Sequence, residues 1–340
     1  MKNVFIKFVL LSLTLVLNSC SPDNTTKNLV NPTEDLSIVY VAGNKNGHAC
    51  YWNDNQLVML DSGTFTNTSA EKIIVVNGDV YVFGSGSSNN IYKSLFWKNG
   101  VLTNLTNQFS TNSYSVSVTD MNVIGNDVYF VGFTYPIPFD NNGPSSLVYW
   151  KNNVKNIVTN YPDSIFTQSR IDVVNNNIYI LGAGNMNFPS TRGYYVNNVY
   201  NEIPNTDLYG ITVNKNNNDV YVFGAKYSAN SSYYKNLTNG TEILIPNSLG
   251  VEIDIDFDEN NNTFVGYSNK IFKNGTLVFD GSAYINSRVY DFQFLNNNTY
   301  KMTFFGVNGT SPSCSLDINE TNVMQAATGE AFISFFVVQN

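Results

Sequence analysis

Two stretches decide the fold: VNGDVYVFG at residues 76–84 and LFWKNGVL at residues 95–102. In each, an Asn-Gly step separates runs of β-branched and aromatic residues, which suit a half-buried pleated strand. A two-residue type I′ turn needs positive φ at both central positions, and Asn and Gly adopt that conformation at the lowest cost. The sequence therefore predicts two tight hairpins made of four antiparallel strands: Lys72–Val76, Val80–Gly84, Leu95–Lys98 and Val101–Leu105.

The same unit recurs along most of the chain. The second strand of the unit ends in a glycine at positions 43, 84, 132, 182 and 224, which are steps of 41, 48, 50 and 42 residues. Two weaker copies end at Gly266 and Gly306. A period of 40 to 50 residues with four strands per period is typical of a β-propeller. We count seven units, and six blades remain the alternative if one weak late copy is not a blade.

The two ends of the repeat region predict how the ring closes. The first unit begins directly at its second strand, Leu36–Gly43, whereas a spare apolar run, Ala331–Val338, follows the last unit. The C-terminal strand is therefore expected to complete the first blade, which removes an exposed sheet edge. Residues 36–340 are predicted to form one all-β propeller domain.

The third strand of the unit and its turn share a pattern close to Tyr-Trp-Lys-Asn-Gly. Copies include YWNDN at 51–55, FWKNG at 96–100, YWKNN at 149–153 and IFKNG at 271–275. This pattern resembles the YWKNG propeller repeats of secreted or lipidated Bacteroidetes proteins, most of them functionally uncharacterised. The resemblance spans Leu36 to the C-terminus, and it implies an architecture without implying an activity.

The N-terminus has the layout of an exported lipoprotein. Lys2 and Lys7 flank the start of a ten-residue apolar run, Phe8–Leu17, which is too short for an ordinary membrane span and suits a signal peptide. The following LNSC, residues 17–20, resembles a bacterial lipobox, which implies a signal peptide at 1–19 and lipidation of Cys20. An ordinary secretory signal with a chance cysteine is the alternative. Residues 20–35 then form the lipidated cysteine and a flexible polar tether.

This layout predicts a place in the cell. The lipid on Cys20 would anchor the propeller to a membrane of the bacterial envelope, and we expect the outer membrane, with its periplasmic or surface side left open. The chain has 26 acidic against 18 basic residues, a formal net charge of −8, and no basic stretch. Nucleic-acid binding is therefore not expected.

Two cysteines lie within the propeller. Cys50 and Cys314 each come two residues before a third-strand anchor, Trp52 and Leu316, in the first and last units. Closure of the ring would make these units neighbours. However, face-packed sheets lie about 10 Å apart, whereas a disulfide needs Cα atoms within roughly 7 Å. We therefore expect two buried thiols.

Strand order sorts the connections onto two faces. The first-to-second and third-to-fourth connections are tight and share one side, which we call the turn face; the others form the loop face. The long loop-face connections are 85–92, 106–117, 133–146, 159–169 and 183–192. Because binding residues concentrate on long loops, the candidate sugar- or peptide-binding residues are Tyr135, Phe139, Asp140, Phe188 and Arg192. The alternative is that these aromatic side chains only pack the loops together.

One acidic run suggests a cation. Asp254, Asp256 and Asp258 match the first half of an EF-hand loop, but the glycine at its sixth position and the glutamate at its twelfth are missing. Asp254 and Asp256 alternate with apolar residues on a predicted first strand, which lines the central channel of a propeller. A calcium site and a structural turn are both open.

Other chemistry has little support in the sequence. His48 is the single histidine, so a histidine metal cluster is excluded, and no Gly-x-Ser-x-Gly elbow is present. The sequence thus favours a non-enzymatic, envelope-anchored lipoprotein whose propeller binds a protein, peptide or glycan through the loop face. Two alternatives remain: a structural assembly component of the outer membrane, and a glycan-processing enzyme using two carboxylates from Asp120, Asp172, Asp254 and Asp256.

Overall fold

A computed structural model describes residues 37–138, 143–162, 169–182, 193–245, 248, 253–280, 287–295, 298–305, 313–319 and 321–338. These residues belong to one compact unit, Ser37–Asn340. The predicted signal peptide, Cys20 and tether lie outside the described residues. In the described part of the chain, no helix combines the length and apolar character needed to cross a membrane.

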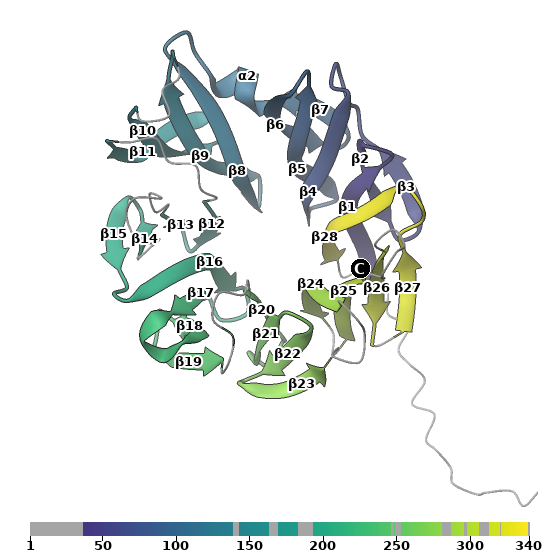
Figure 1. Cartoon of the computed structure of the whole chain (residues 1–340), viewed down its shortest axis with the longest axis vertical. Coiled ribbons are helices and arrows are strands. Elements are labelled where there is room, and N and C mark those ends of the chain that lie inside the picture. The colour runs from purple at the N-terminus through teal and green to yellow at the C-terminus, as the bar shows by residue number, and fades with distance from the viewer. Residues whose placement is uncertain are drawn as a thin grey trace, which may run out of the picture. The chain divides into compact units, whose positions relative to one another are not determined.

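Seven four-stranded antiparallel sheets follow one another around a ring, which confirms the seven-bladed β-propeller (Figure 1). Blade 1 comprises β28 (Glu330–Val338), β1 (Ile38–Lys45), β2 (His48–Asn53) and β3 (Gln56–Met59). Blade 2 comprises β4 (Asn67–Val76), β5 (Asp79–Ser88), β6 (Ile91–Lys98) and β7 (Val101–Asn104). Blade 3 comprises β8 (Tyr114–Ile124), β9 (Asp127–Pro136), β10 (Ser145–Lys151) and β11 (Val154–Tyr161).

The remaining blades repeat this order. Blade 4 comprises β12 (Ile171–Val174), β13 (Asn177–Leu181), β14 (Gly193–Val196) and β15 (Val199–Glu202). Blade 5 comprises β16 (Thr206–Asn214), β17 (Asp219–Lys226), β18 (Ser231–Asn236) and β19 (Glu242–Ile245). Blade 6 comprises β20 (Ile253–Phe257), β21 (Thr263–Tyr267), β22 (Lys270–Lys273) and β23 (Thr276–Asp280). Blade 7 comprises β24 (Ser287–Leu295), β25 (Asn298–Phe305), β26 (Ser313–Ile318) and β27 (Thr321–Gln325).

The ring closes as predicted. β28 pairs antiparallel with β1 along its length, from Ile38 opposite Val338 to Lys45 opposite Glu330. Figure 1 shows this pairing as the yellow C-terminal strand beside the purple first strand. The seam between blades 7 and 1 is a shared hydrophobic core that contains both Cys50 and Cys314. Both thiols are buried and free, and burial raises the pKa of each to about 12.

The asparagine of the Tyr-Trp-Lys-Asn-Gly pattern joins the two hairpins of a blade. Asn99 adopts positive φ, its Oδ1 accepts the backbone N–H of Val80 at 2.8 Å, and its Nδ2 donates to Asp79 at 2.8 Å. We call this two-bond arrangement the asparagine clamp. It recurs at four further turns, formed by Asn152, Asn197, Asn274 and Asn319.

The lysine of the same pattern adds an ion pair. Lys98 lies 2.9 Å from Asp79 and covers the Tyr81 ring, with its Nζ 5.0 Å from the ring centre. Lys151 repeats both contacts with Asp127 and Tyr129. The tryptophans of the pattern are core: Trp97 and Trp150 are among the most deeply buried side chains. The repeated motif is therefore used by the scaffold.

Four of the glycines that mark the sequence period face a β-bulge in the first strand. In blade 2 the extra residue is Glu71, because Ala70 pairs with Gly84 and Lys72 pairs with Phe83. The bulge brings the Ser69 carbonyl so close that a Cβ on Gly84 would lie 1.9 Å from its oxygen. Blades 1, 3 and 5 repeat this approach at Gly43, Gly132 and Gly224.

Two expected loops are partly regular structure. In 85–92, β5 and β6 continue beyond the core and meet at a turn where Asn89 and Asn90 have φ of 52° and 62°. In 106–117, the short helix α2 (Leu105–Phe109) fills the gap between blades 2 and 3, with Asn104 as its N-cap. Both segments are rich in Ser, Asn and Thr, which are typical of loops, so the sequence did not predict the hairpin extension or the helix.

We predict that Gly84→Ala destabilises the protein by about 3 kcal/mol, because the added Cβ would overlap a backbone carbonyl that cannot move without breaking the bulge. The control is Gly100→Ala. Its Cβ meets no atom within 4 Å, and only its φ of 80° is unfavourable, so it should cost about 1–2 kcal/mol. Urea unfolding measures both, and equal losses would contradict the prediction.

Burial also predicts the reactivity of the two core thiols. Iodoacetamide acts on the thiolate, so the raised pKa of Cys50 and Cys314 should keep both unmodified in the native protein at neutral pH. Both should react once urea unfolds the chain. Peptide mapping of each site gives the result, and rapid native alkylation of either cysteine would show that the seam opens.

Candidate functional site

The first strands of the seven blades surround a central channel. Residues of β4, β8, β12, β16, β20, β24 and β28 line it, and its volume is about 1180 Å³. The lining contains the carboxylates of Asp120, Asp172, Asp254, Asp256 and Asp291. The four acids that the sequence could not pair therefore share one cavity.

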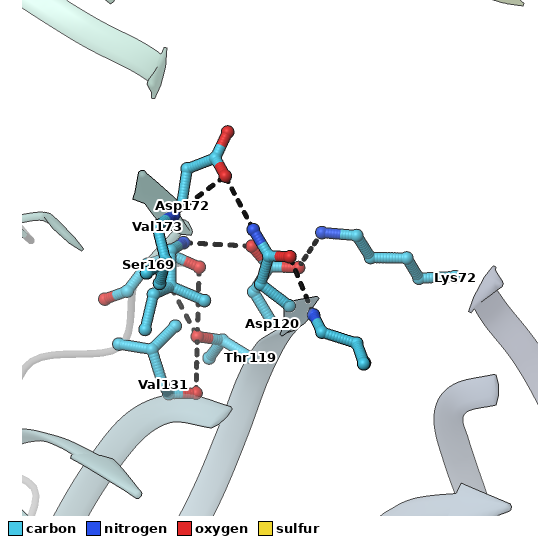
Figure 2. A network of polar contacts seen from close by, with 10 residues as sticks. Lys72, Thr119, Asp120, Val131, Ser169, Asp172 and Val173 are labelled. Atoms are coloured by element: carbon cyan, nitrogen blue, oxygen red, sulfur yellow. Dashed lines mark hydrogen bonds and ion pairs between the residues drawn. The ribbon is translucent and has the colours of Figure 1, made fainter. Parts of the chain in front are cut away.

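The channel carboxylates bridge neighbouring blades. Asp120 of blade 3 accepts the backbone N–H of Ile171 in blade 4 at 3.0 Å, and Lys72 of blade 2 donates to the same carboxylate at 2.7 Å. Figure 2 shows Asp120 between Lys72 on one side and the strand of Asp172 on the other. In the same way, Asp172 accepts the backbone N–H of Val213 in blade 5 at 2.9 Å.

The same arrangement recurs where the ring closes. Asp256 of blade 6 accepts the backbone N–H of Phe294 in blade 7 at 2.7 Å. Asp291 of blade 7 accepts the N–H of Phe335 in blade 1 at 3.2 Å, and Gln293 adds two bonds to the same strand. A carboxylate therefore receives the N–H of the next first strand at four seams. These bonds satisfy backbone donors that have no neighbouring strand on the channel side.

Charge is distributed unevenly around the channel. Blades 2 to 5 contribute Glu71, Lys72, Asp120, Arg170, Asp172 and Lys215, whose formal charges cancel. Among the lining residues that the structure describes, blades 6 and 7 contribute Asp254, Asp256 and Asp291 and no lysine or arginine. The formal charge of the lining is therefore negative on the side of blades 6 and 7.

This crowding alters proton binding. Desolvation raises the pKa of Asp256 to about 7, and the nearby Asp254 adds to the rise, while the N–H groups of Phe294 and Phe257 oppose it. Desolvation also raises the pKa of Asp291, with repulsion from Asp254 and Asp256 in the same direction. The pKa of Asp172 is raised by burial as well, against the attraction of Lys215.

The three residues proposed for calcium have different roles. Asp254 and Asp256 line the channel, whereas Ile255 and Phe257 face a buried core, as alternation predicts. Asp258 begins the next turn, where it accepts the backbone N–H groups of Asn260 and Asn262, the Asn262 amide and Lys273 Nζ. No group of three or more His, Cys, Asp or Glu side chains suited to a metal ion occurs among the described residues. The calcium site stays a prediction, and Asp258 has the structural-turn role.

The candidate binding residues on the loops are only partly within the described structure. Tyr135 lies in β9, is buried, and packs near Phe133 in the core between blades 3 and 4. Burial raises its pKa. Phe139, Asp140, Phe188 and Arg192 lie outside the described residues. Tyr135 is buried because β9 extends to Pro136, so residue 135 is part of the strand and its side chain points into the core.

Other apolar side chains are exposed on the loop face. Ile91 and Tyr92, at the tip of the β5–β6 hairpin, are 59% and 76% exposed. Ile137 follows β9, and Tyr227 lies in the 3₁₀ turn η1 (Tyr227–Ala229) between β17 and β18; both are exposed. All four belong to second-to-third connections. Sequence analysis named the connection 85–92 but none of these four side chains, because it weighted loop length above the position of a residue at a hairpin tip.

His48 has a local partner. Its Nδ1 lies 3.1 Å from Ser62 Oγ. The Ser62 hydroxyl also hydrogen-bonds to the hydroxyl of Thr68, which accepts the backbone N–H of Ala49. These contacts join blade 1 to the start of blade 2. The network holds the connection between β3 and β4 against β2 and β4, and its residues are not part of the channel lining.

Comparison with known proteins adds the fold alone. No family model and no curated protein matches the chain. The structure is similar to Pyrococcus horikoshii acylaminoacyl peptidase, with a TM-score of 0.52, 9% identity, and coverage of 88% of this chain and 50% of the peptidase. It is also similar to a chain of the nidogen/laminin complex (TM-score 0.42, 10% identity, 88% and 98% covered) and to TolB from Acinetobacter baumannii (0.43, 10%, 72% and 63%). The chain thus spans half the length of the peptidase.

The channel acids predict how stability depends on pH. The folded-state pKa of Asp256, about 7, lies above the unfolded value of about 3.9, so the folded state holds the proton more tightly. The stability from this group is therefore full below about pH 4 and is lost as pH rises through about 7. Asp256→Asn keeps the acceptor for Phe294 without titrating, so it should flatten this decline in unfolding free energy.

The matched control for this experiment is Asp79→Asn on the turn face. Asn99 and Lys98 lower the pKa of Asp79, so the effect of this group appears only as pH falls. Asp79→Asn should keep the decline between pH 4 and 7, as measured by urea unfolding across that range. A decline as steep in Asp256→Asn as in the wild type would sink the prediction.

Proposed function

We propose that the chain is a non-enzymatic, envelope-anchored lipoprotein whose propeller binds a protein, peptide or glycan partner through its loop face. The lipid on Cys20 and the outer-membrane location belong to the proposal. Their support is the sequence layout of residues 1–35. The propeller fold supports the scaffold role, since its strand order places the C-terminal ends of the second strands of all seven blades on one face.

The observation that carries the proposal is the set of exposed apolar tips on the loop face. Ile91, Tyr92, Ile137 and Tyr227 come from blades 2, 3 and 5, and each exposes apolar area to water, although the Tyr227 hydroxyl donates to Asp207. Aromatic side chains at such positions suit sugar rings and peptide side chains, because they offer a large surface at little cost in conformational entropy. The turn face also exposes apolar side chains, such as Val101, which is an aliphatic side chain beside a clamped third-to-fourth turn.

The channel carboxylates support a scaffold role over acid–base chemistry. A glycosidase needs one carboxyl group to give a proton and another to act as base or nucleophile. Here Asp120, Asp172, Asp256 and Asp291 each accept a backbone N–H of the adjacent blade. These seam bonds give the four carboxylates a structural role between blades, which favours the scaffold over a glycosidase.

We expect Tyr92→Ser to weaken binding of the partner by at least about tenfold, as is usual when an aromatic anchor is truncated. The measurement is an array of glycans and peptides probed with the full chain in detergent. Val101→Ser is the matched control, because Val101 is 70% exposed but follows a turn on the opposite face. The proposal fails if both variants bind like the wild type to every ligand found, or if Val101→Ser alone loses binding.

A further inference from the structure

Asn-Gly turns with the same backbone differ in how their side chains are held. Asn77, Asn99 and Asn274 are all exposed, have φ of 53°, 50° and 48°, and precede glycines with φ of 79°, 80° and 81°. They are three of the four Asn-Gly turns with this backbone in the described chain; the fourth, Asn46-Gly47, has φ of 52° and 79° and connects β1 to β2 on the loop face. Any difference in their chemistry must therefore come from the side chain and its partners.

The asparagine clamp holds two of the three. Asn99 accepts the Val80 N–H and donates to Asp79, as described above. Asn274 accepts the backbone N–H of Thr263 at 2.9 Å and donates to Asn262 Oδ1 at 2.7 Å. In the described part of the chain, the side chain of Asn77 makes no hydrogen bond. Asn77 lies in the first-to-second turn of its blade. The clamped asparagines lie instead in third-to-fourth turns, from which they reach the start of the second strand.

We propose that Asn77 is a site of spontaneous deamidation and that the asparagine clamp suppresses the same reaction at Asn99 and Asn274. The backbone nitrogen of Gly78 attacks Cγ of Asn77, forming an N–C bond. The Cγ–Nδ2 bond breaks, and ammonia leaves with the proton of the Gly78 amide. Water then opens the five-membered imide at either carbonyl, and the product is aspartate or isoaspartate. No oxidant, reductant or enzyme takes part.

Access to the attacking nitrogen favours reaction at this turn. Glycine carries no side chain to shield its amide, and a Cβ placed on Gly78 would meet no atom within 4 Å. Gly100 is equally open, so accessibility alone does not separate Asn77 from Asn99. The remaining difference is the freedom of the asparagine side chain to turn its Cγ toward that nitrogen.

The clamp restricts that freedom. For Asn99 to react, its Cγ must leave the position where Oδ1 accepts from Val80 and Nδ2 donates to Asp79, so both bonds break before attack. Asn77 rearranges without such a loss. Two hydrogen bonds of ordinary net strength correspond to a rate about tenfold or more slower at the clamped turns.

The fold can tolerate the product at Asn77. Its side chain is exposed and unpaired in the described structure, so a carboxylate there removes no contact. At Asn99 a carboxylate would lose the Nδ2 donor and stand against Asp79, 2.8 Å away. The modification therefore places a negative charge, and for isoaspartate an extra backbone atom, on the turn face of blade 2 without opening the blade.

The test is peptide mapping of the full chain during incubation at mildly alkaline pH, with and without urea. In the native protein, amide loss at Asn77 should be about tenfold or more faster than at Asn99 and Asn274. In urea the three rates should converge, because the local Asn-Gly sequence is the same. Equal native rates, or a faster reaction at Asn99, would overturn the proposal.

A variant tests the role of the clamp. Asn262→Ala removes the acceptor of Asn274 Nδ2 and should speed amide loss at Asn274 about fivefold, the effect of one hydrogen bond. Asn77 and Asn99 lie in blade 2, far along the chain, and their unchanged rates would show that the fold is intact. If Asn274 reacts no faster while those rates hold, the clamp does not protect. A second measurement compares Asn77→Asp, which should keep the wild-type melting temperature, with Asn99→Asp, which should lower it.

Discussion

The structure depends on the need to satisfy backbone N–H groups of the first strands, which have a neighbour on one side and the channel on the other. An open strand edge inside a protein leaves donors without acceptors. Here the preceding blade supplies a carboxylate or amide oxygen, as Asp120, Asp172, Asp256 and Asp291 show. One bond thus completes a strand and joins two blades. The acidic lining, the negative side of the channel and the raised pKa of Asp256 all follow from this solution.

The composition follows from a second local rule. The high asparagine content of the chain has a structural use in the turns. Asparagine tolerates positive φ, and its amide offers a donor and an acceptor at once. Five blades use both groups to join the third-to-fourth turn to the start of the second strand, whereas Asp54 and Thr238 supply the acceptor in blades 1 and 5. Side-chain amides thereby join turns that lie outside the hydrophobic core of each blade.

Sequence alone predicted the blade count, the ring closure and the tight turns, because repetition averages over errors in single elements. It predicted the alternation of Asp254 and Asp256 with core residues for the same reason. It could not pair the channel acids, since each depends on a strand 38 to 51 residues away. It also placed Tyr135 on a binding loop, because the point at which β9 ends depends on packing between blades 3 and 4. The period-marking Gly84 was found, but its cause, a bulge in the facing strand, is a three-dimensional property.

The pairing of β1 with β28 sets an order of events for the chain. Most blades consist of segments that are adjacent in sequence and can form soon after they leave the ribosome. The first blade instead combines residues 38–45 with residues 330–338, from the two ends of the domain's sequence. Contacts between such distant segments form late, because the intervening chain must first be brought together. Until then the core around Cys50 and Trp52 lacks its covering strand. A chain whose last strand is delayed or missing would therefore expose an apolar sheet edge to proteases and to aggregation.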